Sequence, residues 1–199
     1  MKIGILGGTF DPPHIGHLIL ASEALDQLSL SQVLWLLTPC PPHKTEQKIT
    51  ALAHRQRMVE LAIEDNPGFT LSTVDIDRPS PHFAVDTMKI LRKQAPEIEY
   101  HYLMGLDSLN DLPAWHTPAE FVRSCDHIVV MLRQGESVDI PRLETKIPHL
   151  EEKLIFLRTP VMDISGSDIR LRVASGKSFR YFIPEKVFRY IQENHLYLD

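Results

Sequence analysis

The fold is decided by residues 2–39, which read KIGILGGTFDPPHIGHLILASEALDQLSLSQVLWLLTP. The apolar run over 2–8 stops at two glycines, which is typical of a buried strand. From Ile15 to Leu28, apolar side chains recur at helical spacing, and residues 31–39 form a second apolar run that ends in proline. A strand, a helix and a strand in this order predict a βαβ unit, and therefore a parallel sheet.

The alternation of strand and helix patterns continues to the C-terminus. Further strands are predicted over 69–77, 99–105, 127–133 and 153–158, and further helices over 53–65, 81–94, 117–125, 167–176 and 184–195. Residues 134–152 are polar and are expected to be irregular. We predict an α/β, doubly wound, Rossmann-like fold with a mostly parallel sheet, helices on both faces and a helical C-terminal end, with ligands beyond the carboxyl ends of the strands. One domain is expected over 1–199, with the helices from about 165 to 199 packed as a subregion.

Composition narrows the class of partner. The chain has 199 residues, 26 acidic against 21 basic, and a net charge of −5. This balance argues against a broad grip on nucleic acid or an anionic membrane, and the first apolar run is too short to span a membrane. Cys40 and Cys125 have no paired-motif spacing, so we expect a reducing, cytoplasmic location. The sequence leaves a homo-oligomer open.

The turn GGTFDPPHIGH, residues 7–17, carries chemistry between the first strand and the first helix. The unpaired N–H groups and the dipole of a helix start favour an anion. Gly7 and Gly8 would let the backbone approach a ligand closely, and the two prolines stiffen the turn. His14 and His17 are three residues apart and face the same side of a helical turn. These features suit a phosphate ligand.

Other interpretations of the turn stay open at this point. Neither GxGxxG nor GxxxxGK[ST] occurs in the chain. A zinc site is one alternative, because histidines at i and i+3 can share a metal, with Asp11 as the nearby third ligand. A plain glycine turn with surface histidines is the other. We assign no metal-ligating residue.

Two motifs resemble those of a known superfamily. His14-Ile15-Gly16-His17 resembles the (H/T)xGH signature of the nucleotidyltransferases, and ISGSDIR, residues 164–170, resembles their second signature, ISSTxIR. Between them lie PPHK (41–44), GLDS (105–108) and Trp115, and the chain ends in IPEKVFRYIQENHLY. This set is similar to the bacterial nicotinate-nucleotide adenylyltransferase family over nearly the whole chain.

The resemblance implies an enzyme of NAD biosynthesis that transfers the adenylyl group of ATP to nicotinate mononucleotide, giving deamido-NAD and pyrophosphate. Two alternatives are retained: a pantetheine-phosphate adenylyltransferase or cytidylyltransferase of the same superfamily, and a nucleotide-binding module without catalysis. Mg²⁺ is expected to arrive with ATP as a cofactor and to keep several water ligands. No general base is required, because a phosphate monoester with a second pKa of about 6 is already mostly a dianion at neutral pH.

The resemblance also implies roles for individual residues. His17 is the candidate donor to the α-phosphate, His14 assists at the triphosphate, and Arg170 holds the leaving pyrophosphate. The implied ATP site comprises Gly8, Thr9, Phe10, His14, His17, Gly105, Asp107, Ile164, Ser165, Ser167 and Arg170. The implied mononucleotide site comprises Lys44, Phe83, Ala84 and Trp115. Plain structural roles remain alternatives for four of these: a helix cap for Asp107, a solvent-facing side chain for Lys44, a core position for Trp115 and a solvated helix charge for Arg170.

The chain departs from the family pattern at three places, of which Pro13, where the family usually has no proline, is expected to have little consequence. Gly166 stands where the family commonly has Ser or Ala, next to Ser167, and either Ser165 or Ser167 is expected to cap the following helix. Phe83 and Ala84 stand where the family often has Tyr-Thr. Ala84 can supply a backbone N–H but no hydroxyl. The sequence therefore does not distinguish nicotinate mononucleotide from nicotinamide mononucleotide as the substrate.

Overall fold

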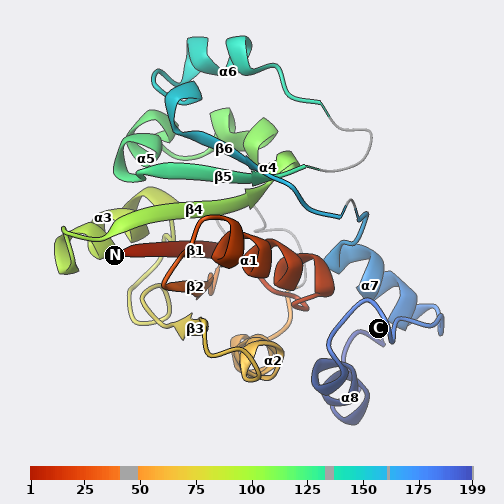
Figure 1. Ribbon diagram of the computed structural model, residues 1–199. Coiled ribbons are helices and arrows are strands. Elements are labelled where there is room, and N and C mark those ends of the chain that lie inside the picture. The colour runs from red at the N-terminus through yellow and green to blue at the C-terminus, as the bar shows by residue number, and fades with distance from the viewer. Residues whose placement is uncertain (41–48, 133–136, 161, 199) are drawn as a thin grey trace.

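In the computed structural model, which describes residues 1–40, 49–132, 137–160 and 162–198, six strands form one parallel sheet in the order β3-β2-β1-β4-β5-β6 (Figure 1). The strands are β1 (Lys2–Gly8), β2 (Gln32–Leu37), β3 (Phe69–Ser72), β4 (Glu99–Gly105), β5 (His127–Met131) and β6 (Leu154–Leu157). The order reverses between β1 and β4, as in doubly wound folds. The predicted fold class is therefore confirmed.

Helices cover both faces of this sheet (Figure 1). They are α1 (Ile15–Gln27), α2 (Leu52–Ile63), α3 (Ala84–Gln94), α4 (Leu106–Asp111), α5 (Pro118–Ser124), α6 (Ile140–Lys146), α7 (Gly166–Ala174) and α8 (Glu185–Glu193), with short 3-10 helices η1 (Leu112–Ala114) and η2 (Glu151–Lys153). Side chains of α1 and α2 pack on one face and those of α3 to α6 on the other, giving two buried apolar clusters. Successive strand residues point to opposite faces, so β1, β2, β4, β5 and β6 contribute to both clusters, whereas the apolar residues of β3 belong to the cluster formed with α1 and α2.

Two elements differ from the prediction around residues 69–84. The strand predicted over 69–77 ends at Ser72, because the chain then turns so that buried Asp75 meets Arg78 at 2.9 Å. The helix predicted from Pro81 begins only at Ala84, since Arg78 holds the carbonyl of Pro81 at 2.8 Å in an extended segment. Both differences are imposed by the Arg78 side chain rather than by local propensity.

Two helices, α6 and η2, lie in the segment 134–152, which was predicted to be irregular. Asp139 caps α6 by accepting the N–H of Arg142 at 3.0 Å. Buried Leu143 and Ile147 are four residues apart, which is helical spacing within an otherwise polar stretch. Helix α4 follows β4 directly and was foreseen only as a short helix that Asp107 could cap.

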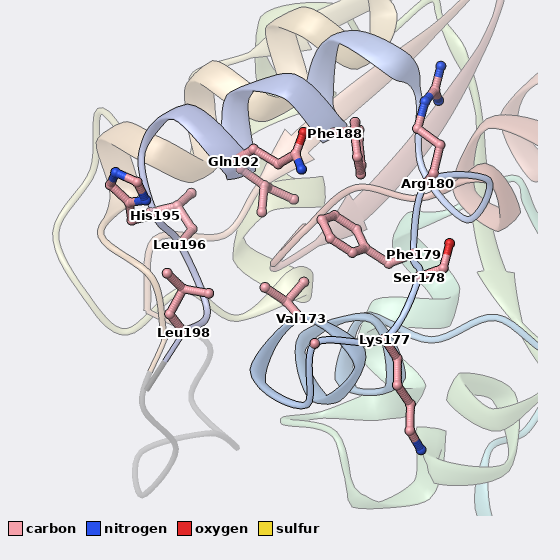
Figure 2. Close-up of a pocket in the computed structure, with 12 residues that line it drawn as sticks. Val173, Lys177, Ser178, Phe179, Arg180, Phe188, Gln192, His195, Leu196 and Leu198 are labelled. Atoms are coloured by element: carbon pink, nitrogen blue, oxygen red, sulfur yellow. The ribbon is translucent and has the colours of Figure 1, made fainter.

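The C-terminal residues form a helical subregion with a core of its own. Helices α7 and α8 and the segment between them pack against Met58 of α2. The buried apolar members are Ile169, Val173, Phe179, Ile183, Val187 and Ile191. A cavity of about 550 Å³ lies between the two helices (Figure 2). Lys177 points away from its apolar residues, whereas the guanidinium of Arg180 lies over the ring of Phe188, 5.2 Å from the centroid. None of the helices in the described ranges has the length and apolar character needed to cross a membrane.

Candidate active site

A cavity of about 990 Å³ opens where the strand order reverses, beyond the carboxyl ends of β1 and β4. Gly8 at the end of β1 and Gly105 at the end of β4 lie in its wall, together with the starts of α1 and α7. Doubly wound folds bind their ligands at this place, because the connections of neighbouring strands diverge there to opposite faces of the sheet.

The turn after β1 is held by an aromatic anchor. Phe10 has a φ of +47°, in the left-handed region that a bulky residue rarely adopts. Its side chain is buried and packs against Trp35 and His17, with ring centroids 5.1 and 5.0 Å away. This packing offsets the backbone strain, which is on the order of 1–3 kcal/mol for such a residue. The turn is therefore fixed before any ligand binds.

The two histidines of the first motif face each other as predicted. His14 is the residue that precedes α1, and its ring stacks on that of His17 with 3.6 Å between centroids. The backbone N–H of His14 donates to Nδ1 of His17 at 3.1 Å. Since a backbone N–H can only donate, Nδ1 must be the unprotonated nitrogen, and the neutral ring carries its proton on Nε2. The local backbone thus selects the tautomer of His17.

The glycines after β1 make room for protein groups. A Cβ on Gly7 would lie 2.5 Å from the hydroxyl of Tyr102, and one on Gly8 would lie 3.0 Å from the ring of Phe10. These contacts give both positions a reason to be glycine within the protein itself; close approach of a ligand stays a prediction. Both residues still line the cavity, but the space that their missing side chains leave is filled by two aromatic residues.

The second motif starts α7 with a defined cap. Ser165 precedes the helix, and its hydroxyl oxygen accepts the backbone N–H of Asp168 at 3.1 Å. Of the two serines predicted as caps, Ser165 is the one that caps. Ser167 instead accepts a hydrogen bond from Nη2 of Arg170 at 3.2 Å. Capping leaves the N-terminus of α7 ordered at the wall of the cavity.

The two motifs contact each other directly. Nη1 of Arg170 donates to the main-chain oxygen of Asp11 at 2.7 Å. A Cβ on Gly166 would lie only 3.1 Å from the same oxygen, so glycine at this position lets the two segments approach closely. The starts of α1 and α7 therefore line one cavity, with the guanidinium of Arg170 between them.

The other end of the cavity is formed by the start of α3 and by the segment after α4. Phe83 precedes α3, and its ring stacks on His116 with 4.0 Å between centroids. Trp115 is half-buried and packs edge-on against Tyr102, with 6.2 Å between ring centroids. It also lines the cavity, so it has both a packing role and a place in the cavity wall. Ala84 is the first residue of α3 and lines the cavity.

Asp107 does not cap α4. The cap position is Gly105, where a Cβ would lie 2.5 Å from Oδ1 of Asp107. Asp107 lies in the first turn of the helix and accepts the N–H of Ser108 at 2.9 Å. The missing side chain of Gly105 thus leaves room for the Asp107 carboxylate at the cavity wall.

The comparisons with known proteins agree with this geometry. Residues 5–172 match a family model described as cytidylyltransferase-like. A probable nicotinate-nucleotide adenylyltransferase of Thermomicrobium roseum is 43% identical over 196 residues, covering 98% of this chain and 91% of that protein. One of Dehalococcoides mccartyi is 40% identical and covers 99% and 97%. The chain belongs to the nicotinate-nucleotide adenylyltransferase family.

A solved structure shares the fold at lower identity. It is Plasmodium falciparum nicotinic acid mononucleotide adenylyltransferase complexed with NaAD, with a TM-score of 0.82 and 19% identity, covering 98% of this chain and 97% of that one. Among the three functions expected from the sequence, membership of the nicotinate-nucleotide adenylyltransferase family favours the first over the other superfamily transferases and over a module without catalysis.

The predicted site residues of this adenylyltransferase lie together with one exception. Lys44, like the rest of PPHK, falls outside the described residues. The others line the cavity: Gly8, Thr9, Phe10, His14, His17, Phe83, Ala84, Gly105, Asp107, Trp115, Ile164, Ser165, Ser167 and Arg170. Their contacts with substrates stay predictions.

Arg55 was not predicted from the sequence as a functional residue. It contacts the main chain of the turn that leads into the first motif. Arg55 is only 2% exposed and donates to four main-chain oxygens at 2.7–3.0 Å. These acceptors are Thr9, Thr38, Pro39 and Thr50. Burial lowers the pKa of Arg55, while the charge of Asp11 raises it. One signal was present, because Arg55 lies three and four residues before buried Met58 and Val59, on the apolar face of α2.

Asp11 and Tyr197 join the first motif to the C-terminus. The Tyr197 hydroxyl donates to Oδ1 of Asp11 at 2.7 Å, and the N–H of Thr50 donates to Oδ2 at 3.2 Å. Burial, with the charge of Asp11, raises the pKa of Tyr197. Both oxygens of Asp11 and Nδ1 of His17 accept protein hydrogen bonds, so these three atoms are engaged within the protein.

A buried polar network behind the mononucleotide end was also missed. Asp75 is 4% exposed and accepts from Thr87 at 2.7 Å and from Nε of Arg78 at 2.9 Å. Arg78 also donates to the carbonyl of Phe83 at 3.2 Å. This network fixes the backbone that leads into Ala84, so its function is to position the start of α3.

Proposed function

We propose that the cavity transfers the adenylyl group of MgATP to nicotinate mononucleotide, giving deamido-NAD and pyrophosphate. The observation that carries this proposal is the Arg170–Asp11 contact, because it brings both nucleotidyltransferase motifs to one cavity at the strand-order reversal. The names of the curated relatives, at 36–43% identity over nearly the full length, support the same activity.

In the proposed reaction, a phosphate oxygen of the mononucleotide attacks the α-phosphorus of ATP. The new P–O bond forms as the bond from the α-phosphorus to the bridging oxygen breaks, and pyrophosphate leaves with that electron pair. The attacking phosphate needs no general base, since its second pKa is about 6. Catalysis then depends on alignment of the reactants and on stabilisation of charge.

His17 is suited to stabilise the α-phosphate. Its tautomer is set by the His14 N–H, so Nε2 can donate a hydrogen bond without a prior proton transfer. A donor that is oriented before the reaction is worth about 10²–10³ in rate. The stack with His14 and the contact with Phe10 fix the position of the His17 ring.

The leaving pyrophosphate is assigned to the second motif. The capped N-terminus of α7 offers backbone N–H groups and the positive end of its dipole. Arg170 is already oriented by Asp11 and Ser167, so little side-chain freedom is lost when its guanidinium meets a phosphate. These two features together stabilise the growing negative charge on the leaving group.

Mg²⁺ is proposed to arrive with ATP as part of the substrate. Three of the four aspartates that line the cavity accept protein hydrogen bonds: Asp11 from Tyr197 and Thr50, Asp75 from Thr87 and Arg78, and Asp107 from Ser108; the fourth is Asp111. Such a site fits a cation that is held mainly by phosphate oxygens and water. The two free cysteines fit the reducing cytoplasm in which we place the enzyme.

The mononucleotide is proposed to bind at the start of α3. The first backbone N–H groups of this helix, including that of Ala84, precede the intrahelical hydrogen bonds and favour an anion. A nicotinate carboxylate fits this environment better than the neutral amide of nicotinamide. The stacked rings of Phe83 and His116 and the half-buried Trp115 supply flat surfaces for the pyridine.

The direct test is release of pyrophosphate from ATP with nicotinate mononucleotide, nicotinamide mononucleotide or phosphopantetheine as the acceptor. We expect the nicotinate nucleotide to give the highest kcat/KM, at least about tenfold above the amide, which corresponds to one charge-assisted hydrogen bond. Faster turnover of phosphopantetheine would move the protein to another branch of the superfamily. Absence of pyrophosphate with all three acceptors would contradict an enzymatic function.

A further inference from the structure

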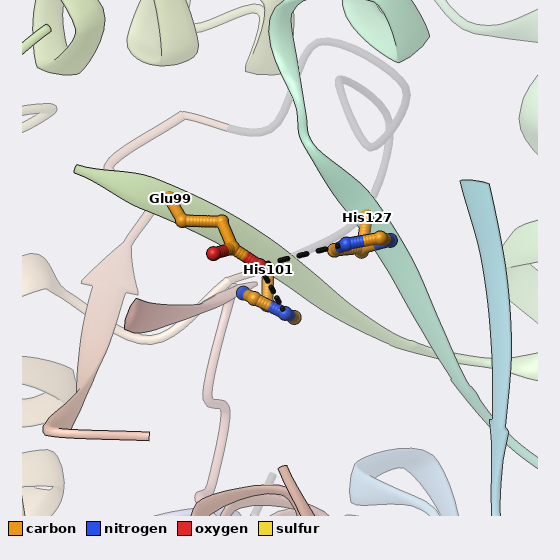
Figure 3. A group of neighbouring side chains, drawn as sticks. All are labelled: Glu99, His101 and His127. Atoms are coloured by element: carbon orange, nitrogen blue, oxygen red, sulfur yellow. Dashed lines mark ion pairs between the residues drawn. The ribbon is translucent and has the colours of Figure 1, made fainter. Parts of the chain in front are cut away.

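A second cluster of chemically versatile side chains lies at the opposite end of the sheet from the cavity. Glu99 and His101 are the first and third residues of β4, and His127 is the first residue of β5 (Figure 3). The register of the two strands places His101 beside His127. Glu99 projects to the same face as His101, because side chains two residues apart on a strand share a face.

The three side chains converge on one point. Oε1 of Glu99 lies 3.4 Å from Nε2 of His101 and 3.5 Å from Nε2 of His127 (Figure 3). The three potential ligand atoms lie within 4.8 Å of one another, and in the described part of the chain this is the one such group of three His, Cys, Asp or Glu residues. None of these residues takes part in the proposed adenylyl transfer.

The distances fit a bound cation better than direct hydrogen bonds. Charged hydrogen bonds from nitrogen to a carboxylate are about 2.7–2.9 Å long, which is well below the two distances in this cluster. In a tetrahedral zinc site with bonds of about 2.1 Å, neighbouring ligand atoms lie about 3.4 Å apart. Both Glu99 contacts match this edge of a tetrahedron, whereas the two imidazole nitrogens are only known to lie within 4.8 Å of each other, so any separation longer than this edge would have to shorten when the ion binds.

Burial keeps bulk water away from one of the two imidazoles. His101 is 2% exposed, and its Nε2 faces the carboxylate of Glu99. Nδ1 of His101 and Nδ1 of His127 are also buried without a hydrogen-bond partner in the described residues, but they are the other nitrogens of these rings, so an ion at Nε2 does not pair them.

We propose that Glu99, His101 and His127 bind a zinc ion at the amino ends of β4 and β5. Two imidazoles and one carboxylate form a donor set that suits Zn²⁺ rather than Mg²⁺ or Ca²⁺, which prefer oxygen ligands. The side chains of Glu99 and His127 are 39% and 35% exposed, so the ion can enter from solvent and a water can complete the coordination. Bound zinc would link β4 to β5 and stabilise the sheet.

The test uses the full-length protein after removal of metals by dialysis. Titration with ZnCl₂ in a calorimeter should show one site, and Co²⁺ should give the visible absorption of a tetrahedral complex. Glu99→Gln and His127→Gln should each weaken zinc binding at least about tenfold, since each loses one of three ligands. His149→Asn is the matched control, because His149 also lies 3.4 Å from a glutamate, Glu152, but on the surface and without a second imidazole.

Thermal melting gives a second readout. Zinc should raise the Tm of the wild type and of His149→Asn, and should leave His127→Gln unchanged. Retained pyrophosphate release by His127→Gln would show that this variant is folded. The proposal is overturned by the absence of saturable zinc binding up to about 100 µM, by equal affinity in His127→Gln, or by loss of binding only in His17→Ala, which would place the ion at the cavity.

Discussion

Nη1 of Arg170 donates a hydrogen bond to the main-chain oxygen of Asp11 at 2.7 Å, although 159 positions separate the two residues. Helix α7 follows β6, the outermost strand on one side of the sheet, yet its first turn returns to the end of central β1. Gly166 permits this approach. The nucleotide site is therefore completed by a tertiary contact, and each motif alone supplies only half of it.

The first prediction concerns this contact. Arg170→Ala should lower kcat and raise the KM for ATP, each at least about tenfold, because it removes both a charged ligand of the pyrophosphate and the link to the first motif. Arg170→Lys should recover part of kcat, since lysine keeps the charge, but its single nitrogen cannot span Asp11, Ser167 and a phosphate as the planar guanidinium does. Steady-state kinetics would measure both constants. Arg172→Ala, on the same helix but outside the cavity wall, is the control, and an equal loss in it would contradict the assignment.

His17→Ala should lower kcat by at least about 10² with a small change in the KM for ATP, because the Nε2–H donor acts mainly on charge that develops in the transition state. Since His17 also packs on Phe10, the Tm of the variant must be measured beside its kinetics. A kcat near that of the wild type in a folded variant would remove His17 from the mechanism.

Local patterns could be predicted, whereas long-range contacts could not. The βαβ start, both motifs and the cap of α7 depend on residues close together in the chain, and the sequence places them correctly. The importance of Arg55 depends on carbonyl groups from three other segments, and that of Asp11 on Tyr197, 186 positions away. No periodicity encodes such contacts. The start of α3 was placed too early for the same reason, because a single arginine, Arg78, holds the preceding residues extended.

Arg55→Met should destabilise the fold by about 3 kcal/mol or more, because four main-chain carbonyl groups lose their buried donor and each unsatisfied group costs on the order of 1–3 kcal/mol. The free energy of unfolding from urea titration would measure this. Arg57→Met is a matched control two residues away, since Arg57 is half-exposed and pairs only with Glu60 among the described residues. A loss below about 1 kcal/mol in Arg55→Met, or a similar loss in both variants, would show that Arg55 does not hold the turn.

The two cysteines should differ in reactivity. Burial raises the pKa of Cys125 to about 12, so its thiol is protonated and inert at pH 8, whereas Cys40 is exposed. A disulfide reagent should therefore label one thiol per native chain quickly and the second only after unfolding in denaturant. Cys40→Ser should abolish the fast phase. If two thiols of the native protein reacted quickly with the reagent, the connection between α5 and β5, which contains Cys125, would have to open readily.

The last prediction tests why Gly7 is glycine. A Cβ at this position would lie 2.5 Å from the Tyr102 hydroxyl, and Tyr102 cannot turn aside, since its ring is 6% exposed and packs against Phe121 at 4.8 Å and Trp115 at 6.2 Å. Gly7→Ala should therefore cost about 1–3 kcal/mol of stability, the range for overpacking. Tyr102→Phe removes the clashing oxygen, so Gly7→Ala/Tyr102→Phe should recover most of the loss in a double-mutant cycle. If glycine were required for a ligand instead, Gly7→Ala would raise the KM for ATP without lowering the Tm. Adding Tyr102→Phe would then leave the KM for ATP raised.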